Sequence, residues 1–291
     1  MKKRINGIEL VGFSLAGEET VITVPEYNVC FDVGRAPRDV IPIDNVCLSH
    51  GHMDHAAGVA YYFSQRGFIG TSPGRVIVHR CLAQAIQRLM DVWADIEGHH
   101  APGEVCGVEH LVEVGIRRNL VVRAFDVNHG PGCLGYTLVE SRHKLKPELA
   151  GKSGPQLVAL KRQGVAIEDR TEVSLLTYSG DTALGRFLDL GFVRASQAAL
   201  IECTFFDRDH VDRARAGRHI HVSDLPRVLE AIPNAQVLLT HVTRRTALQQ
   251  AKRLLADVLK PADRERVGLF MDRPPRGAVR RPVPNGVAAE D

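Results

Sequence analysis

The stretch "LSHGHMDHAAG", Leu48–Gly58, decides the fold class of this chain. Six consecutive positions hold four side chains that bind metals or transfer protons: His50, His52, Asp54 and His55. The apolar run before them, 45–49, predicts a buried strand, and the small residues after them can begin a helix. Side chains two apart point the same way in an extended chain, so His50 and His52 can bind one ion. As the chain turns into the helix, Asp54 and His55 point toward a neighbouring position, so the stretch predicts one loop serving two adjacent metal sites.

Length and composition limit the class of protein. The chain has 291 residues, of which 44% are hydrophobic, enough for the core of one large α/β domain. Near the N-terminus, Asn6, Gly7 and Glu9 interrupt any apolar run that could serve as a signal sequence. No stretch approaches the roughly 20 apolar residues of a membrane-spanning helix. We therefore expect a soluble, cytoplasmic protein with no membrane association.

The six cysteines are scattered and include no CxxC pair. This distribution predicts reduced core residues rather than disulfides or a zinc ribbon. Any metal must then be bound by His, Asp or Glu. Neutral imidazole nitrogen and carboxylate oxygen suit zinc, and an open coordination position leaves room for a water molecule.

Short apolar runs alternate with amphipathic stretches along most of the chain. Strands are predicted at 21–24, 28–33, 45–49, 75–79, 120–127, 134–140, 172–179, 198–204 and 235–241. Helical spacing of apolar residues is found at 82–96, 225–232 and 248–259. Most of the strand candidates are continuous apolar runs, which is typical of strands buried on both faces. The pattern favours helices that cover sheets which are themselves packed together.

Two ions need more ligands than one loop supplies, and three candidates follow other predicted strands. His129 lies in "VNHGPG", Asp181 in "YSGDT", and His241 ends "QVLLTH". An isolated His or Asp at a strand end is more often a hydrogen-bonded structural residue. Three of them, each after an apolar strand, favour a shared metal centre.

The segment 141–163 has an unusual charge. It contains six basic residues and one acidic residue, Glu148, for a net charge of +5, within a chain whose formal charge is +3. Two prolines and two glycines in the same segment predict an irregular, exposed loop, which could simply be solvated. The last twenty residues, 272–291, are rich in proline and lack an apolar period, so they are predicted to be disordered.

Five motifs taken in order resemble the metallo-β-lactamase superfamily and, within it, the short form of ribonuclease Z. They are "SHGHMDH", "YSGDT", "LIECTF", "HIHVSD" and "THVTRR". The likeness extends from about Gly12 to Phe270, with "DVGRAP" matching the early turn of that family. The segment "KLKPELAGKSGPQLVALKRQGV" resembles its substrate-gripping insertion, as found in plant-type short enzymes. The resemblance implies an α/β fold of the αββα sandwich type, with two packed mixed sheets and outer helices, as one domain over 1–271 with an insertion at about 141–172.

The resemblance also implies a site with two zinc ions, for which Mn²⁺ or Mg²⁺ could substitute. It places His50, His52 and His129 on one ion and Asp54, His55 and His241 on the other, with Asp181 bridging both. Metal binding lowers the pKa of water to near 7, which provides a nucleophile at neutral pH. Asp54 would orient this water and accept its proton.

The implied substrate is precursor transfer RNA, cut at its 3′ trailer, usually by a homodimer. His221 matches the acid that protonates the departing ribose oxygen, although His219 could have the same orientation. Arg245 matches an arginine that holds phosphate, although Arg244 could be confused with it. Phosphate contacts in the insertion are assigned to the lysines Lys144, Lys146 and Lys161.

Two departures from the family pattern put the substrate in doubt. Thr246 stands where the family commonly has an aromatic residue, and the segment after His129 is unusually rich in glycine. A small-molecule hydrolase acting on a lactone, thioester, lactam or cyclic nucleotide therefore remains open. A non-catalytic RNA-binding module is a third interpretation, which the complete set of seven expected ligands makes the weakest.

Overall fold

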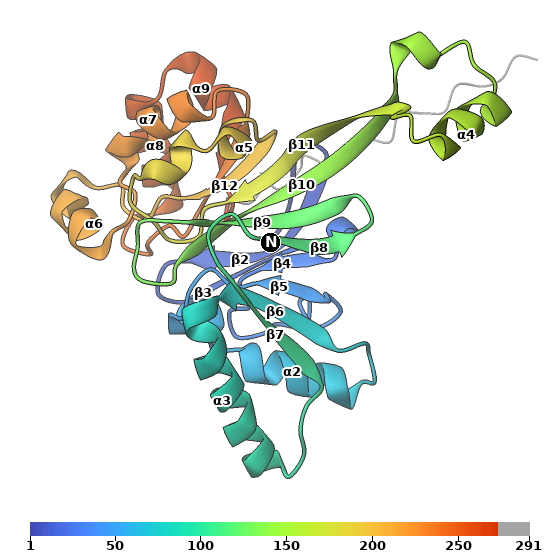
Figure 1. The fold of residues 1–291 in the computed structure, drawn as a ribbon. Helices are drawn as coiled ribbons and strands as arrows, with labels where there is room; N and C mark the ends of the chain where they lie inside the picture. The colour runs from blue at the N-terminus through green and yellow to red at the C-terminus, as the bar shows by residue number, and fades with distance from the viewer. Residues whose placement is uncertain (273–291) are drawn as a thin grey trace, which may run out of the picture.

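The computed structural model describes residues 1–272. They form two seven-stranded mixed sheets packed face to face, with helices on the outer faces (Figure 1). The predicted α/β sandwich is confirmed. In each sheet the strands lie in the order of the sequence, β1 to β7 in the first and β14 back to β8 in the second.

The bounds of the strands agree closely with the nine predicted ranges, and five further strands complete the two sheets. The first sheet consists of β1 (Lys2–Ile5), β2 (Ile8–Leu15), β3 (Glu19–Val24), β4 (Val29–Phe31), β5 (Asn45–Cys47), β6 (Gly74–His79) and β7 (Gly103–Val108). The second consists of β8 (Glu113–Arg117), β9 (Leu120–Asp126), β10 (Leu134–Leu145), β11 (Glu168–Tyr178), β12 (Ala198–Glu202), β13 (Gln236–Thr240) and β14 (Val267–Leu269).

Helices cover the outer face of each sheet. The first sheet carries α1 (Met53–Ala56), α2 (Val59–Phe68) and α3 (Arg80–Glu97). The second carries α5 (Gly191–Arg194), α6 (Val211–Gly217), α7 (Leu225–Ala231), α8 (Leu248–Val258) and α9 (Pro261–Arg266), while α4 (Gly154–Arg162) stands apart from both (Figure 1). Among the described residues, no helix is long and apolar enough to cross a membrane.

Strand β12 explains why an unbroken apolar run suits this fold. All five of its residues are buried. Ala198 and Leu200 point into the core between the sheets, whereas Ala199 and Ile201 pack under the outer helices. Successive side chains of a strand face opposite sides, so a strand buried on both faces needs apolar residues at every position.

The carboxyl ends of several strands meet at one edge of the sandwich. The chain leaves β5 toward His50, β9 toward His129, β11 toward Asp181 and β13 toward His241. Across the inner core, the rings of Phe31 and Tyr178 lie 4.9 Å apart and tie the two sheets together below this edge. The fold therefore brings residues that are far apart in sequence to one edge.

The basic segment is more regular than the sequence predicted. Strands β10 and β11 continue beyond the sheet as a two-stranded ribbon in which Arg142 pairs with Thr171 and Leu145 with Glu168. The helix α4 follows, begun by a Ser153 capping box with Pro in its first turn. Proline in the first turn favours a helix because that position needs no amide donor. We call residues 141–172 the arm; it projects from the body of the molecule (Figure 1).

The described residues end at the start of the predicted C-terminal tail. Of the predicted disordered tail, 272–291, only Asp272 belongs to the described residues, and its carboxylate lies 2.8 Å from the ammonium group of Lys252.

Candidate metal centre and active site

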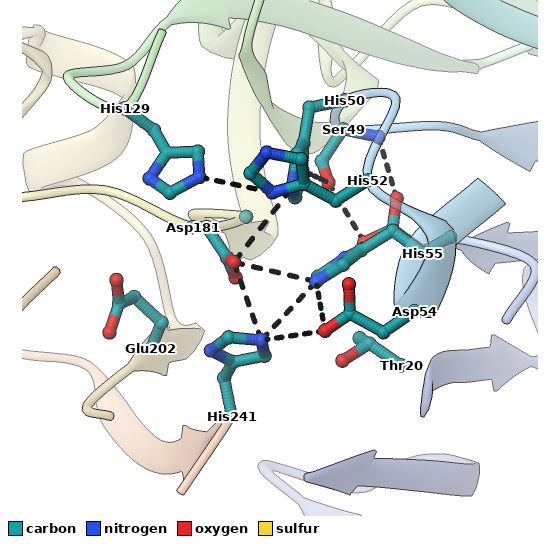
Figure 2. Close-up of polar contacts among 12 residues, drawn as sticks. Thr20, Ser49, His50, His52, Asp54, His55, His129, Asp181, Glu202 and His241 are labelled. Carbon is teal, nitrogen blue, oxygen red and sulfur yellow. Dashed lines mark hydrogen bonds and ion pairs between the residues drawn. The ribbon is translucent and has the colours of Figure 1, made fainter. Parts of the chain in front are cut away.

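The seven predicted ligands converge at the edge where the strand ends meet (Figure 2). Their donor atoms form two adjacent groups. We call the first site A, with His50, His52, His129 and Asp181, and the second site B, with Asp54, His55, His241 and a shared contact to Asp181. Each residue offers one donor atom. The four donor atoms of site A lie within 4.8 Å of one another, and so do the three of Asp54, His55 and His241 in site B.

Site A is built from three imidazoles and a carboxylate. His52 Nδ1 lies 2.9 Å from His50 Nε2 and 3.4 Å from His129 Nε2. Asp181 Oδ2 lies 3.8 Å from His50 Nε2. A tetrahedral zinc ion with bonds of about 2.0–2.1 Å separates its ligand atoms by roughly 3.4 Å, so these spacings fit such an ion.

Site B has the same spacing. His55 Nε2 and His241 Nε2 are 3.3 Å apart, and Asp54 Oδ2 lies 3.6 and 3.4 Å from them. Asp181 Oδ2 lies 3.4 Å from His55 and 3.3 Å from His241. One carboxylate oxygen therefore faces both groups, which suits a residue that bridges two ions.

The other oxygen of Asp181 supports a metal centre independently. Asp181 Oδ1 is buried and has no hydrogen-bond partner among the described residues. An unpaired buried carboxylate oxygen costs free energy, so such an atom requires an explanation. A bound cation would satisfy this oxygen and would also reduce the repulsion among the lone pairs of the converging imidazoles. The residues present therefore fit a pair of divalent ions.

The imidazole of His55 is oriented by Asp32, which comes from the "DVGRAP" turn. Asp32 is fully buried, and its carboxylate accepts hydrogen bonds from Ser49, Tyr178 and His55 Nδ1, the last at 2.7 Å. Because Nδ1 of His55 donates to Asp32, its Nε2 is left with a lone pair that points into site B. Such partners of a ligand histidine fix its tautomer and its direction.

The tautomers of three further histidines follow from their partners in the same way. Thr204 Oγ1 donates to Glu202 and can therefore accept from His241 Nδ1 at 2.9 Å. The backbone oxygen of Arg218 accepts from His129 Nδ1 at 3.2 Å. Ser49 Oγ donates to Asp32 and accepts from His50 Nδ1 at 2.9 Å. In each case Nε2 is free to bind a metal.

Two residues at this centre have an unusual backbone. Asp32 has φ 54° and His241 has φ 58°, in the left-handed region that non-glycine residues rarely adopt. A residue in this region costs about 1–3 kcal/mol and persists where surrounding contacts hold it. The backbone amide of His241 donates to Ser14 Oγ at 2.8 Å, and the amide of Asp32 donates to the Cys47 carbonyl at 3.0 Å. These contacts keep the side chain of His241 directed at site B and that of Asp32 directed at His55 Nδ1.

The pKa values of the candidate ligands are shifted by burial and by neighbouring charges. Burial and the neighbouring His55 lower the pKa of His50 to about 2, so this ring is neutral. Burial alone would raise the pKa of Asp54, but the adjacent His241 and His55 hold it below its usual range. Burial likewise opposes ionisation of Asp181, and the histidines around it outweigh burial and lower its pKa. Burial opposes a charge on His55, but Asp181 and Asp32 outweigh burial and raise its pKa, so this ring must release a proton when a metal binds to its Nε2.

His221, the residue that the resemblance matches to the acid, is not among the residues that line the cavity at the metal centre. The residue is buried, its Nε2 donates to the Asp207 carbonyl at 3.1 Å, and its Nδ1 accepts from Ser223. Both ring nitrogens are therefore occupied in beginning the short 3-10 helix Val222–Asp224. Its side chain does not line the metal cavity.

His219, the alternative that the sequence left open, lines the cavity beside the metal centre. Its ring stacks on His241 with centroids 5.4 Å apart and lies 4.9 Å from the ring of His129. Nδ1 donates to Glu202 Oε1 at 2.8 Å, which leaves Nε2 available on the cavity side. The sequence left His219 open as an alternative but gave no role to Glu202, whose only signal was an acidic residue at the end of the apolar run "LIEC".

The surroundings of the two arginines separate their possible roles. The guanidinium of Arg244 pairs with Glu18, whereas Arg245 is exposed, lines the cavity and has no ion-pair partner in the described part of the chain. Thr246 is buried and donates to Asp207 at 2.5 Å, so it does not replace the expected aromatic residue as a substrate contact.

An open cavity of about 400 Å³ leads to the metal centre. Its walls include ligands of both sites together with His219, Phe205 and Arg245, and the turn Ala16–Gly17. The amide of Gly17 donates to Asp54 Oδ2 at 2.9 Å. The three predicted lysines of the insertion lie on the arm, outside this cavity, with Lys144 and Lys161 exposed and Lys146 half-buried.

Comparison with known proteins agrees with this geometry. A family model described as a beta-lactamase superfamily domain matches residues 27–242. A tRNase Z from Arabidopsis thaliana is 30% identical over 263 residues, which are 89% of this chain and 94% of that protein. A ribonuclease Z from Myxococcus xanthus is 26% identical over 231 residues, 73% of this chain and 74% of that protein. The solved structure of the human short-form tRNase Z superposes with a TM-score of 0.58 at 14% identity and covers 89% of this chain and 94% of its own.

The fold and the site thus define a metal-dependent hydrolase of the β-lactamase superfamily. Within that superfamily, the chain belongs to the ribonuclease Z (tRNase Z) family.

Proposed function

We propose that this protein is a dinuclear zinc phosphodiesterase that removes 3′ trailers from precursor transfer RNA. The observation that carries the proposal is the pair of donor groups sharing Asp181 beside an open cavity lined by His219 and Arg245. The names of the relatives favour transfer RNA as the substrate.

Each residue of the cavity named below has its own role in the proposed reaction. Two zinc ions supply, when bound, a lowered pKa for water and positive charge beside the phosphate. Asp54, oriented by the amide of Gly17, accepts the proton of the attacking water. Arg245 binds the phosphate that is cut, because a guanidinium presents two parallel donors to its oxygens.

His219 rather than His221 is the residue that we propose as the acid. Burial disfavours a charged ring, but the Glu202 carboxylate outweighs burial and raises the pKa of His219. The ring therefore holds a proton near neutral pH. Its Nε2 can pass this proton to the departing 3′ oxygen of the ribose, while Nδ1 stays hydrogen-bonded to Glu202.

The arm supplies affinity for folded RNA. Along the ribbon the charges are mixed, because Lys144 pairs in register with Asp169 and Arg142 contacts Glu140. Toward the tip, positions 146–167, basic side chains outnumber the acidic one: Lys146, Lys152, Lys161 and Arg162 against Glu148. This concentration favours phosphate contacts at the far end of the arm, at a distance from the metal centre.

A second function belongs to the same superfamily. A hydrolase of a small phosphodiester, lactone or thioester would use the same metal centre, and the loss of the aromatic side chain at Thr246 favours it. The activity of such an enzyme would not depend on the arm or on salt concentration, because a small substrate cannot contact the metal centre and the arm at the same time.

The test is a comparison of substrates under identical conditions. A precursor transfer RNA with a 3′ trailer, bis(p-nitrophenyl) phosphate, a lactone and a thioester are each incubated with the wild type and with Asp54→Ala. We expect the wild type to cut the RNA efficiently and the variant to lose this activity. Hydrolysis of a small ester without RNA cleavage would overturn the RNA assignment and leave the metal centre standing.

A further inference from the structure

Arg218 ends helix α6 directly before His219, and its backbone is strained. It is the C-cap of α6, with φ 53° and ψ 54° in the left-handed region. Glycine or asparagine normally occupies such a position, because most side chains crowd the backbone there. Strain of this kind persists at functional sites, where the surrounding structure holds it. An arginine at this position therefore points to a function of its side chain.

Two hydrogen bonds join Arg218 to His129, a candidate ligand of site A. The backbone oxygen of Arg218 accepts from His129 Nδ1, and Arg218 Nη1 donates to the backbone oxygen of His129, both at 3.2 Å. Any residue at position 218 could form the first bond, because it uses the backbone. The second bond requires the arginine side chain and fixes the direction of the guanidinium. The guanidinium is thus oriented beside site A before a ligand binds.

The positive charge of Arg218 has no counter-charge among residues 1–272. Its side chain is exposed and forms no ion pair there, whereas Arg215 of the same helix pairs with Asp212 at 3.7 Å. The helix dipole does not explain a cation at position 218, because Arg215 already lies in the last turn. A guanidinium has five N–H donors, and the described residues engage one of them. An oriented, unpaired guanidinium suits an anionic ligand.

The two arginines near the metal centre belong to different halves of it. Arg218 contacts His129 of site A, whereas Arg245 follows His241 of site B and lines the cavity. The ring of His219 lies beside both halves, with its centroid 4.9 Å from that of His129 and 5.4 Å from that of His241. A polymer chain that crosses both sites therefore passes one arginine on the side of each site.

We propose that Arg218 binds a second phosphate of the RNA, next to the phosphate that is cut. The inference rests on the proposed cleavage of RNA and adds a contact on the side of site A, away from Arg245. A guanidinium presents two parallel donors to phosphate oxygens, and a side chain already held by His129 loses less freedom on binding. A substrate with a single phosphodiester cannot use this contact. Arg218 therefore favours a nucleic acid chain over a small phosphodiester.

Three substitutions of Arg218 separate the charge of its side chain from the strain of its backbone. Arg218→Gln removes the charge alone, Arg218→Gly removes charge and strain, and Arg218→Lys keeps the charge without the two parallel donors. The KM for precursor transfer RNA should rise about tenfold or more in the Gln and Gly variants and less in the Lys variant. Hydrolysis of bis(p-nitrophenyl) phosphate by the same full-length, Zn²⁺-loaded proteins should be unchanged.

Salt dependence and thermal stability provide two further measurements. Binding of precursor transfer RNA is measured in an Asp54→Ala background, where Arg218→Gln should reduce the slope of log affinity against log salt by about 0.7–0.9, the loss of one phosphate contact. Arg218→Gly should have a higher Tm than Arg218→Gln, because glycine adopts the left-handed backbone without strain.

Arg264 provides a matched control. It is likewise exposed, and its Nε donates to a backbone oxygen, that of Leu259, at 2.8 Å. It lies in α9, before the amino end of β14, whereas the metal centre lies beyond the carboxyl ends of the strands. Arg264→Gln should leave the KM and the salt dependence unchanged.

Several results would overturn the role of Arg218 while the wild type still cuts the RNA. They are an unchanged KM in Arg218→Gln, equal losses on both substrates, an equal effect of Arg264→Gln, and a lower Tm in Arg218→Gly than in Arg218→Gln. A wild type that neither binds nor cuts the RNA would overturn the proposed function and this contact together. The behaviour of the wild type therefore distinguishes the two failures.

Discussion

His219 and His221 are two residues apart, but their rings have opposite surroundings. His221 donates to a backbone carbonyl and accepts from Ser223, so it acts within a turn. His219 stacks on the metal-site histidine His241 and is held by Glu202. The spacing in sequence could not distinguish them, because the choice depends on how the chain turns after α6.

Substitution of each histidine separates the two roles. His219→Ala should lower kcat for precursor transfer RNA by about 10²–10⁴, the usual contribution of an acid that protonates a leaving group. Hydrolysis of bis(p-nitrophenyl) phosphate should fall far less, because nitrophenolate leaves without a proton. His221→Ala should instead lower the free energy of unfolding by about 1 kcal/mol through loss of the helix cap. Equal losses on both substrates for His219→Ala would refute its role as acid.

The pH dependence of cleavage reports on Glu202. The acid must be protonated, so cleavage is maintained below the pKa of His219 and declines above it. The carboxylate of Glu202 raises this pKa, so Glu202→Gln should shift the alkaline decline of kcat to lower pH. Asp224→Asn, which removes a carboxylate bonded to the backbone of His221, is the matched control and should leave the decline in place. An unchanged profile in Glu202→Gln would contradict this coupling.

Strands were predicted well from the sequence where their burial requires apolar residues. The nine predicted strands all exist, because a strand buried on both faces must be apolar at each position. The β1–β2 hairpin was not predicted, although Asn6 and Gly7 with φ 44° and 83° form the Asn-Gly turn that favours such hairpins. The residues that interrupt the apolar run near the N-terminus therefore also form a turn between two strands.

Periodicity predicted helix α3 correctly but not which of its apolar residues are buried, and composition misjudged the arm. The helical spacing at 82–96 selected Leu89, Trp93 and Ile96, which remain exposed. A pattern shows that a face is apolar but not which molecule covers it. In the arm, prolines and glycines predicted irregular structure, whereas pairing between β10 and β11 extends the ribbon beyond the core.

The arm predicts a salt dependence specific to RNA. Replacing Lys144, Lys146 and Lys161 together by Gln should raise the KM for precursor transfer RNA. It should also reduce the slope of log affinity against log salt by roughly 0.7–0.9 for each phosphate group that the variant no longer binds. Hydrolysis of bis(p-nitrophenyl) phosphate should be unchanged. The control replaces three lysines outside the arm, Lys2, Lys252 and Lys260, and an equal effect in the control would refute a specific function of the arm.

At the scale of the whole molecule, the two sheets place ligands from distant parts of the chain in one centre. His50 and His241 are separated by most of the sequence, yet both lie within 4 Å of Asp181 Oδ2. All seven candidate ligands were selected from motifs, because four lie in one loop after β5 and the other three each follow another apolar strand; their binding of metal stays a prediction. The partners that orient them, Glu202 and Thr204 among them, required the three-dimensional structure.

Metal removal should therefore affect stability as well as activity. Metal bound at 1,000 times its Kd stabilises the folded state by about 4 kcal/mol. A chelator should abolish cleavage and lower the Tm of the wild type, and added Zn²⁺ should restore both. Asp181→Asn, which weakens both sites, should show a much smaller change in Tm on chelation. A wild-type Tm that is insensitive to the chelator would contradict a metal centre of this kind.

The metal centre is proposed to hydrolyse one phosphodiester at the 3′ end of a transfer RNA. The most direct measurement is to map the cleavage position and both new ends of a precursor transfer RNA treated with the wild-type protein. We predict a single cut after the acceptor stem, with a 3′-hydroxyl on the transfer RNA and a 5′-phosphate on the trailer. Absence of cleavage, scattered cuts, or a cyclic phosphate at the new 3′ end would contradict this reaction.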